Sequence, residues 1–208
     1  MKRSITVPGT GRARLAPDVA EVRLGVTVTR PTVAEARQAA AESATAILAA
    51  LAAAGVDRGD VRTVGLSVQP EVEYDGRSPR VTGHQVSHRY LVTVRDLDAL
   101  GRVVDGSLAA GATTLDGVSF RARDPATAEA AARVAAVADA RQRAEILASE
   151  AGVALGPVLA VVESTAAGGA PRPMVLARAM VAAESAPTPI EAGTDELTVS
   201  VVVRFAIR

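Results

Sequence analysis

Few residues in this sequence could carry out acid–base or metal chemistry. The 208 residues include two histidines, His84 and His88, and no cysteine. The two histidines share one face of an alternating segment, where four residues of extended strand span about 13 Å. Two ligands of one metal ion, each bonded at about 2.1 Å, must lie much closer than that. The pair therefore cannot hold one ion within a chain, which leaves a site shared between subunits, a polar pair on an apolar sheet face, or a subunit contact.

The other polar residues show no pattern for nucleophilic or phosphate chemistry. Ser107 and Ser119 fall in helix-like and strand-like segments without a nucleophile elbow. Glu71 and Glu73 alternate along a strand, as on a solvated face. Gly9-Thr10-Gly11 lacks the third glycine of a dinucleotide loop and is interpreted as part of a bend or bulge. The sequence predicts no enzyme and no cofactor, with a carboxylate pair formed on folding as the open alternative.

The composition of the chain limits which kinds of partner and which cellular compartment we expect. The 23 basic and 23 acidic residues cancel, so no net positive field attracts nucleic acid. No apolar run approaches the roughly 18 residues of a transmembrane segment. No signal peptide follows Met1. We expect a cytoplasmic protein if Met1 is the native start, and a periplasmic or secreted one if an export signal has been removed.

Strand and helix signals predict an α+β fold with antiparallel sheets, a long β-hairpin and three main helices. Apolar residues alternate from Val22 to Val28 and from Leu197 to Ile207, as in half-buried strands. Thr32 and Glu35 have the spacing of a capping box. The predicted helices cover about 32–55, 97–111 and 125–152. The inner face of the third is expected to comprise Ala130, Val134, Val137, Ala138, Ala144, Leu147 and Ala148.

The hairpin is the main reason to expect self-association. Two alternating segments flank Asp75. Aligning their like faces predicts the cross-strand pairs Val72–His84, Val68–His88 and Leu66–Tyr90. Residues 61–74 would span about 46 Å if extended, against a radius of gyration of about 17 Å for a globule of this length. The hairpin must either coil around the core or project as an arm whose apolar face needs a partner. The expected contacts are Val72, Tyr74, His84, His88 and Tyr90.

A second region of expected contacts lies near the C-terminus. We expect a single domain that covers residues 1–208. The segment at about 164–193 is rich in Ala, Gly and Pro, which predicts a loop-rich excursion from this domain. An apolar stretch within this excursion, from Met174 to Val181, is interpreted as a short helix that docks on this or a neighbouring subunit. Its expected contacts are Met174, Leu176 and Met180.

Taken in order, several short segments resemble the SIMPL domain family across nearly the whole chain. They are Val7-Pro8-Gly9-Thr10-Gly11 with Pro17-Asp18, Leu66 to Pro70, Gly83, Asp96-Leu97, Gly117-Val118-Ser119-Phe120, Ala140 to Glu145, Gly152, Leu155-Gly156 and Pro189-Ile190-Glu191. This family includes bacterial periplasmic immunogenic proteins, proteins linked to oxidative-stress defence and a partner of a pelle-like kinase. Three departures are His84 in place of a common aromatic, Ala192 in place of a usual proline, and the missing export signal.

The resemblance implies an α+β fold, large ring-like or channel-like oligomers and no established catalytic residues. Together with the hairpin, it predicts a non-enzymatic homo-oligomer with a cell-envelope or stress-related role. One alternative is a signalling or stress adapter that binds another protein through an exposed sheet edge. Another is a small-ligand binder or hydrolase whose site forms on folding.

Overall fold

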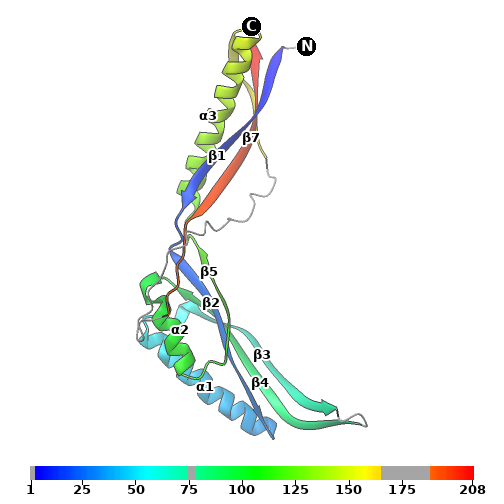
Figure 1. Ribbon diagram of the computed structural model, residues 1–208, viewed down its shortest axis with the longest axis vertical. Helices are drawn as coiled ribbons and strands as arrows, with labels where there is room; N and C mark the ends of the chain where they lie inside the picture. The colour runs from blue at the N-terminus through cyan, green and yellow to red at the C-terminus, as the bar shows by residue number, and fades with distance from the viewer. Residues whose placement is uncertain (1–2, 75–77, 165–187) are drawn as a thin grey trace. The chain divides into compact units, whose positions relative to one another are not determined.

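The computed structural model describes residues 3–74, 78–164 and 188–208, which belong to two compact units (Figure 1). Unit 1 comprises Met1–Pro17, Ala122–Arg178 and Gly193–Arg208, and unit 2 comprises Asp18–Arg121 and Ala179–Ala192. In sequence, the larger segment of unit 2 therefore separates the first strand of unit 1 from the rest of that unit, and a short second segment of unit 2 precedes the last strand of unit 1. The single domain over residues 1–208 stays a prediction.

Unit 2 is a four-stranded antiparallel sheet with helices on one face. Its elements are β2 (Val19–Arg30), α1 (Val33–Ala53), η1 (Arg58–Asp60), β3 (Val61–Tyr74), β4 (Pro79–Val94), η2 (Leu97–Ala99), α2 (Leu100–Ala109) and β5 (Thr114–Arg121). The strand order is β3-β4-β2-β5. Alternate residues of β2 and β4 pack against Ile47 and Leu51 of α1 and Val103 of α2. These contacts form the larger core.

The predicted capping box begins α1. The Thr32 hydroxyl accepts from the Glu35 N–H at 3.3 Å, and the Thr32 N–H donates to Glu35 Oε2 at 3.2 Å. Each bond satisfies a backbone donor that the first helical turn leaves free. The sequence prediction is confirmed here.

The predicted hairpin forms, but its register differs from the predicted one by two residues at Leu66 and Val68, and by three at Val72, beyond a bulge. In the structure, Leu66 pairs with His88, Val68 with Val86, and Val72 with Val81. Register shifts occur between Thr63 and Gly65 and between Glu71 and Val72. A shift of two residues keeps every side chain on its own face, because the strand repeat is two. Alternation alone therefore could not select the register, and the predicted pairs Val72–His84, Val68–His88 and Leu66–Tyr90 are wrong.

Unit 1 packs one helix on a three-stranded antiparallel sheet. Its elements are β1 (Ser4–Leu15), α3 (Ala126–Glu150), β6 (Leu155–Glu163) and β7 (Asp195–Ile207), with strand order β1-β7-β6. Val7, Val201, Val203 and Phe205 face α3 and are almost completely buried. With unit 2, this arrangement confirms the predicted α+β class.

Gly9 and Gly11 let α3 lie unusually close to β1. The register of β1 with β7 runs without a shift from Ser4 to Leu15, so the predicted bend or bulge is wrong. A Cβ atom at Gly9 would overlap the Ala136 carbonyl oxygen, and one at Gly11 would overlap the Ala132 carbonyl oxygen. The glycines therefore allow close packing of the helix on the strand. The pattern of apolar residues in the sequence does not predict this packing.

The same close approach determines which face of α3 is buried. The buried residues are Ala132, Ala136, Ala140, Ala144 and Ala148. Val134 is instead 72% exposed and Leu147 is 50% exposed. Only methyl side chains fit between a helix and a glycine-containing strand at this separation. The predicted inner face was wrong except for Ala144 and Ala148, because it placed the larger side chains inside.

Residues 188–193, the described end of the predicted excursion of about 164–193, form neither helix nor strand. They include Thr188, whose hydroxyl donates to Asp105 Oδ1 at 2.6 Å and whose N–H donates to Asp105 Oδ2 at 3.1 Å. Ile190 packs against the core of unit 2. The end of the excursion is thus attached to α2.

Candidate interaction surface

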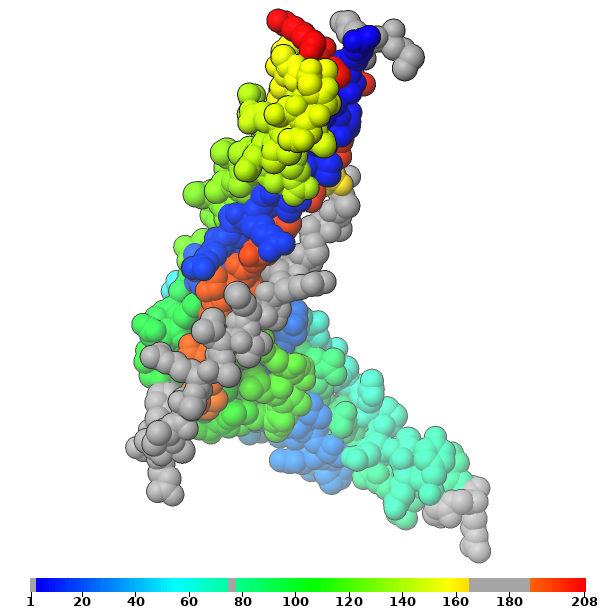
Figure 2. Space-filling view, turned by 45° about the horizontal axis from the view of Figure 1, so that its top comes forward, coloured from blue at the N-terminus to red at the C-terminus, as the bar shows by residue number. Residues whose placement is uncertain are grey.

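The outer part of the β3–β4 hairpin carries exposed apolar side chains, and Figure 2 shows it as a narrow arm of unit 2. We define the arm surface as Leu66, Val68, Val72, Tyr74 and Val81. Leu66 is 64% exposed and Tyr74 is 77% exposed. Even spacing places the four β3 residues on one face, and Val81 joins them because it pairs with Val72. A contiguous apolar patch of this kind is typical of an interaction site.

The arm surface is exposed because α1 covers only part of the sheet. Val86 of β4 is 1% exposed and packs against Ala36 and Ala40 of α1. Its cross-strand neighbour Val68 is 51% exposed, although the strands lie only about 4.8 Å apart. The apolar face of the hairpin therefore passes from core to solvent between β4 and β3.

A hollow beside α1 reflects the same incomplete cover. It has a volume of about 290 Å³ and lies between the C-terminal half of α1 and the beginning of β3. Leu48, Ala52, Val56, Arg58 and Val61 contribute to its lining. The lining is mainly apolar, and no pair of titratable groups converges on it. The hollow is therefore a second apolar depression of unit 2, lined by residues other than those of the arm surface.

The histidines and Tyr90 lie at the boundary between this surface and the core. His84 and His88 are half-buried, opposite Pro70 and Leu66. The His88 Nδ1 and the Tyr90 hydroxyl oxygen are 3.3 Å apart. Tyr90 is only 4% exposed, and its burial raises the pKa of its phenol because the phenolate would lose hydration. Tyr90 is thus a core residue, and its assignment as a surface contact is corrected.

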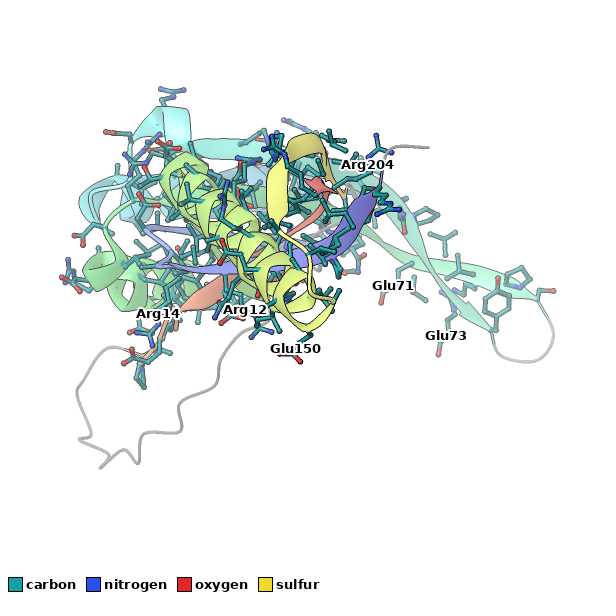
Figure 3. The ribbon with its side chains drawn as sticks, turned by 90° about the horizontal axis from the view of Figure 1, so that it is seen from above. Arg12, Arg14, Glu71, Glu73, Glu150 and Arg204 are labelled. Carbon is teal, nitrogen blue, oxygen red and sulfur yellow. The ribbon has the colours of Figure 1, made fainter. Side chains whose placement is uncertain are left out.

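The opposite face of the arm is polar. Glu71 and Glu73 project from the same side of β3 (Figure 3). Arg80 pairs across from Glu73 on β4. The arm is therefore amphipathic along its length, with solvated charges on one face and the arm surface on the other.

The sequence identified part of this surface. Val72 is half-buried and Tyr74 is exposed, and both lie on the arm surface, while their role as contacts stays a prediction. Met174, Leu176 and Met180 lie outside the described residues. The sequence missed the exposure of Leu66, Val68 and Val81. The run of alanines in α1 could have indicated this exposure. A helix with small inward side chains lies close to the sheet and covers little of its surface.

Across the described ranges, no group of three or more histidine, aspartate or glutamate side chains is placed to hold a metal ion. Within the same ranges, no helix has both the length and the apolar character needed to span a bilayer.

Comparison with known proteins matches residues 5–205 to the SIMPL family, described as a protein of unknown function (DUF541). The 26 kDa periplasmic immunogenic protein of Brucella melitensis biotype 1 is 34% identical over 211 residues, which cover 98% of this chain and 84% of that protein. The protein of the same name from Brucella abortus (strain S19) has the same identity and coverage. The uncharacterized protein YggE of Escherichia coli (strain K12) is 29% identical over 157 residues, or 76% of this chain and 64% of that protein. The chain therefore belongs to the SIMPL family.

Proposed function

We propose that this protein is a non-enzymatic, self-associating SIMPL protein that forms a ring-like or channel-like oligomer with a cell-envelope or stress-related role. The observation that carries the proposal is the arm surface. Val72, Tyr74 and Val81 lie where β3 and β4 extend beyond β2 as a two-stranded ribbon, which is marginally stable in water without further packing. Leu66 and Val68 lie on the edge strand of the three-stranded part that follows. A second copy that covers this face would remove apolar area from water at about 25 cal/mol per Å².

A periplasmic location is part of the proposal. It is supported by the Brucella relative, whose name places it in the periplasm. The names of the relatives mention no enzymatic activity, which supports the non-enzymatic role. Immunoblotting of periplasmic and cytoplasmic fractions from the native cell tests the location. Recovery in the cytoplasmic fraction alone would contradict it.

The arm surface can be tested without disturbing the core. Leu66 and Val68 are 64% and 51% exposed, so the double variant Leu66→Ser/Val68→Ser should fold normally. We expect sedimentation velocity at micromolar concentrations to show an oligomer for the unmodified chain. The variant should sediment as a smaller species because the apolar area available for burial is reduced.

A matched control uses exposed apolar residues of α3. Val134 and Ile146 are 72% and 57% exposed, and Val134→Ser/Ile146→Ser makes the same chemical change away from the arm. This variant should sediment like the unmodified protein. A strict monomer for the unmodified chain would refute self-association, and equal effects of both variants would refute the role of the arm.

A signalling or stress adapter is the second candidate, favoured by the exposed strands at the edges of the sheet in unit 2. β3 and β5 are the outer strands of that sheet, and an extended peptide could pair with either. Capture from the native cell separates the two functions. Self-association predicts recovery of the same chain, whereas the adapter predicts a second protein whose recovery depends on an edge strand and survives in the Leu66→Ser/Val68→Ser variant.

A further inference from the structure

Three exposed arginines gather on the open face of the sheet in unit 2, opposite α1 and α2. Arg62 of β3 and Arg23 of β2 both pair with Leu91 of β4, one on each side. Their α-carbons are therefore about 10 Å apart, two strand spacings. Arg89 lies two residues before Leu91 on β4. It is therefore on the same face, about 7 Å from Leu91 along the strand. The three arginines are therefore neighbours of Leu91 on this face of the sheet.

Within the described ranges no acidic side chain is paired with this arginine triad, although Glu21 lies two residues from Arg23 on the same face of β2. Arg23, Arg62 and Arg89 are exposed, and none makes an ion pair or hydrogen bond with a described residue. On the same face, Arg121 is bound to Glu21 at 2.9 Å. Three neighbouring positive charges repel one another unless an anion lies among them. The triad therefore presents an unbalanced local charge on a chain whose formal net charge is zero.

Arg89 has a glycine neighbour on each of the two adjacent strands. Arg89 pairs with Gly65 of β3 and with Gly25 of β2. The Arg89 side chain lies over Gly65, since a Cβ there would be 3.5 Å from Arg89 Cβ and 3.6 Å from Arg89 Cδ. Larger residues in these rows would occupy the space beside the guanidinium. Gly65 thus gives the Arg89 side chain room to lie across β3, whereas the position above Gly25 is bordered by the His88 carbonyl oxygen and the Thr114 hydroxyl.

A row of hydroxyl groups lies next to the triad. Ser67, Ser87 and Thr27 pair with one another across β3, β4 and β2. The Thr27 hydroxyl donates to the Ser87 hydroxyl at 3.1 Å. One step further, Gln69 and Gln85 pair on the same face. Hydroxyl and amide groups both donate and accept hydrogen bonds, which matches the hydroxyl groups of a carbohydrate.

We infer that this face binds a sugar phosphate, with the phosphate monoester held by Arg23, Arg62 and Arg89 and the sugar against the hydroxyl row. Guanidinium groups bind phosphate oxygens through paired, charge-assisted hydrogen bonds, and three of them match a dianion better than a monoanion. The site is independent of the arm surface, because it uses the opposite face of the sheet. It binds its ligand without any covalent step.

Equilibrium dialysis of the full chain with radiolabelled glucose 6-phosphate at low ionic strength tests the site. We expect saturable binding that weakens about tenfold or more in Arg89→Gln, because a hydrogen bond to a charged group is lost. Arg89→Lys should also weaken binding although it keeps the charge, because lysine cannot form the paired contact. Arg62→Gln provides a second variant at an exposed position.

The matched control is Arg37→Gln, which removes the same charge from an exposed position of α1 on the other side of the sheet. It should leave binding unchanged. Three results would overturn the inference: equal loss in Arg37→Gln, inorganic phosphate binding as tightly as the sugar phosphate, or preferential binding to vesicles of phosphatidylglycerol. Glucose without phosphate should not bind, and saturable binding of glucose would equally overturn it.

Discussion

At the residue scale, contacts between β1 and α3 combine close packing with a hydrogen bond. β1 is an outer strand of its sheet, so some of its backbone N–H groups have no strand partner. The N–H of Thr10, between the two close-packed glycines, donates to Asp139 Oδ2 of α3 at 2.8 Å. Arg143, one turn later, also binds this carboxylate at 2.9 Å. The helix α3 thus packs against β1 and also provides a hydrogen-bond acceptor for a backbone N–H of this edge strand.

A methyl group at Gly9 should be strongly destabilising. In Gly9→Ala the new Cβ would overlap the Ala136 carbonyl oxygen and lie 2.7 Å from Ala140 Cβ. Relief requires backbone movement, and we expect a cost of about 1–3 kcal/mol or more in the free energy of unfolding measured by urea titration. The control is Gly106→Ala in α2, where a Cβ meets no atom within 4 Å. This change should be neutral or stabilise by about 1 kcal/mol. Equal stability of the two variants would contradict the packing argument.

Asp139 should make stability depend on acidity. The N–H of Thr10 is the main cause that holds the pKa of Asp139 below its ordinary value, with Arg143 contributing less. A depressed pKa in the folded state adds stability above the ordinary Asp pKa of about 3.9, and this stability is lost as pH falls through the depressed value. Asp139→Asn should therefore be less stable than the unmodified chain at pH 7, with a smaller difference at pH 3. Urea midpoints at the two pH values measure this, and the same difference at both would disprove it.

At the element scale, the sequence predicts element types better than their contacts. The capping box of α1 was visible because its signal lies within four residues. The hairpin was visible from alternation, but its bulges and two-residue register were not. The α3 face was mistaken because it depends on glycines in a strand more than 120 residues earlier in the chain. The arm surface was only partly predicted, because its exposure depends on how much of the sheet α1 covers.

The capping box provides a clean test of a local signal. Thr32→Ala removes the side-chain acceptor for the Glu35 N–H and should cost about 1 kcal/mol in the free energy of unfolding. The control is Thr45→Ala in the middle of α1, where the hydroxyl donates to the Ala41 carbonyl at 2.8 Å. That change should be neutral or slightly stabilising, because alanine favours helix. Urea titration of both variants measures the two changes in the free energy of unfolding. A larger loss of stability in Thr45→Ala than in Thr32→Ala would contradict the role of the cap.

At the scale of the whole molecule, the chain passes between the two units more than once. β1 belongs to unit 1, residues 18–121 to unit 2, and the later chain returns to unit 1 before the stretch around Thr188 joins α2 in unit 2. β7 then closes unit 1 by pairing with both β1 and β6. No other strand of this sheet joins β1 to β6.

Removing β7 should separate the stabilities of the two units. A chain that ends before Asp195 loses the central strand of the unit 1 sheet and Val201, Val203 and Phe205 of its core. We expect hydrogen–deuterium exchange to show lost protection in β1 and α3, with protection kept in β2 and β4. Loss throughout the chain would indicate one cooperative domain, as the sequence predicted. Retained protection in α3 would show that β7 is dispensable.

The pairing of β1 with β7 has a consequence for biosynthesis. During translation β1 is made before β2 to β6, and its neighbour β7 is made after them, so β1 has no partner in its sheet until β7 has been synthesised. The intervening β2-to-β5 region can meanwhile begin to collapse on its own. A holding factor that shields β1 would therefore act from the synthesis of β1 until β7 has been made.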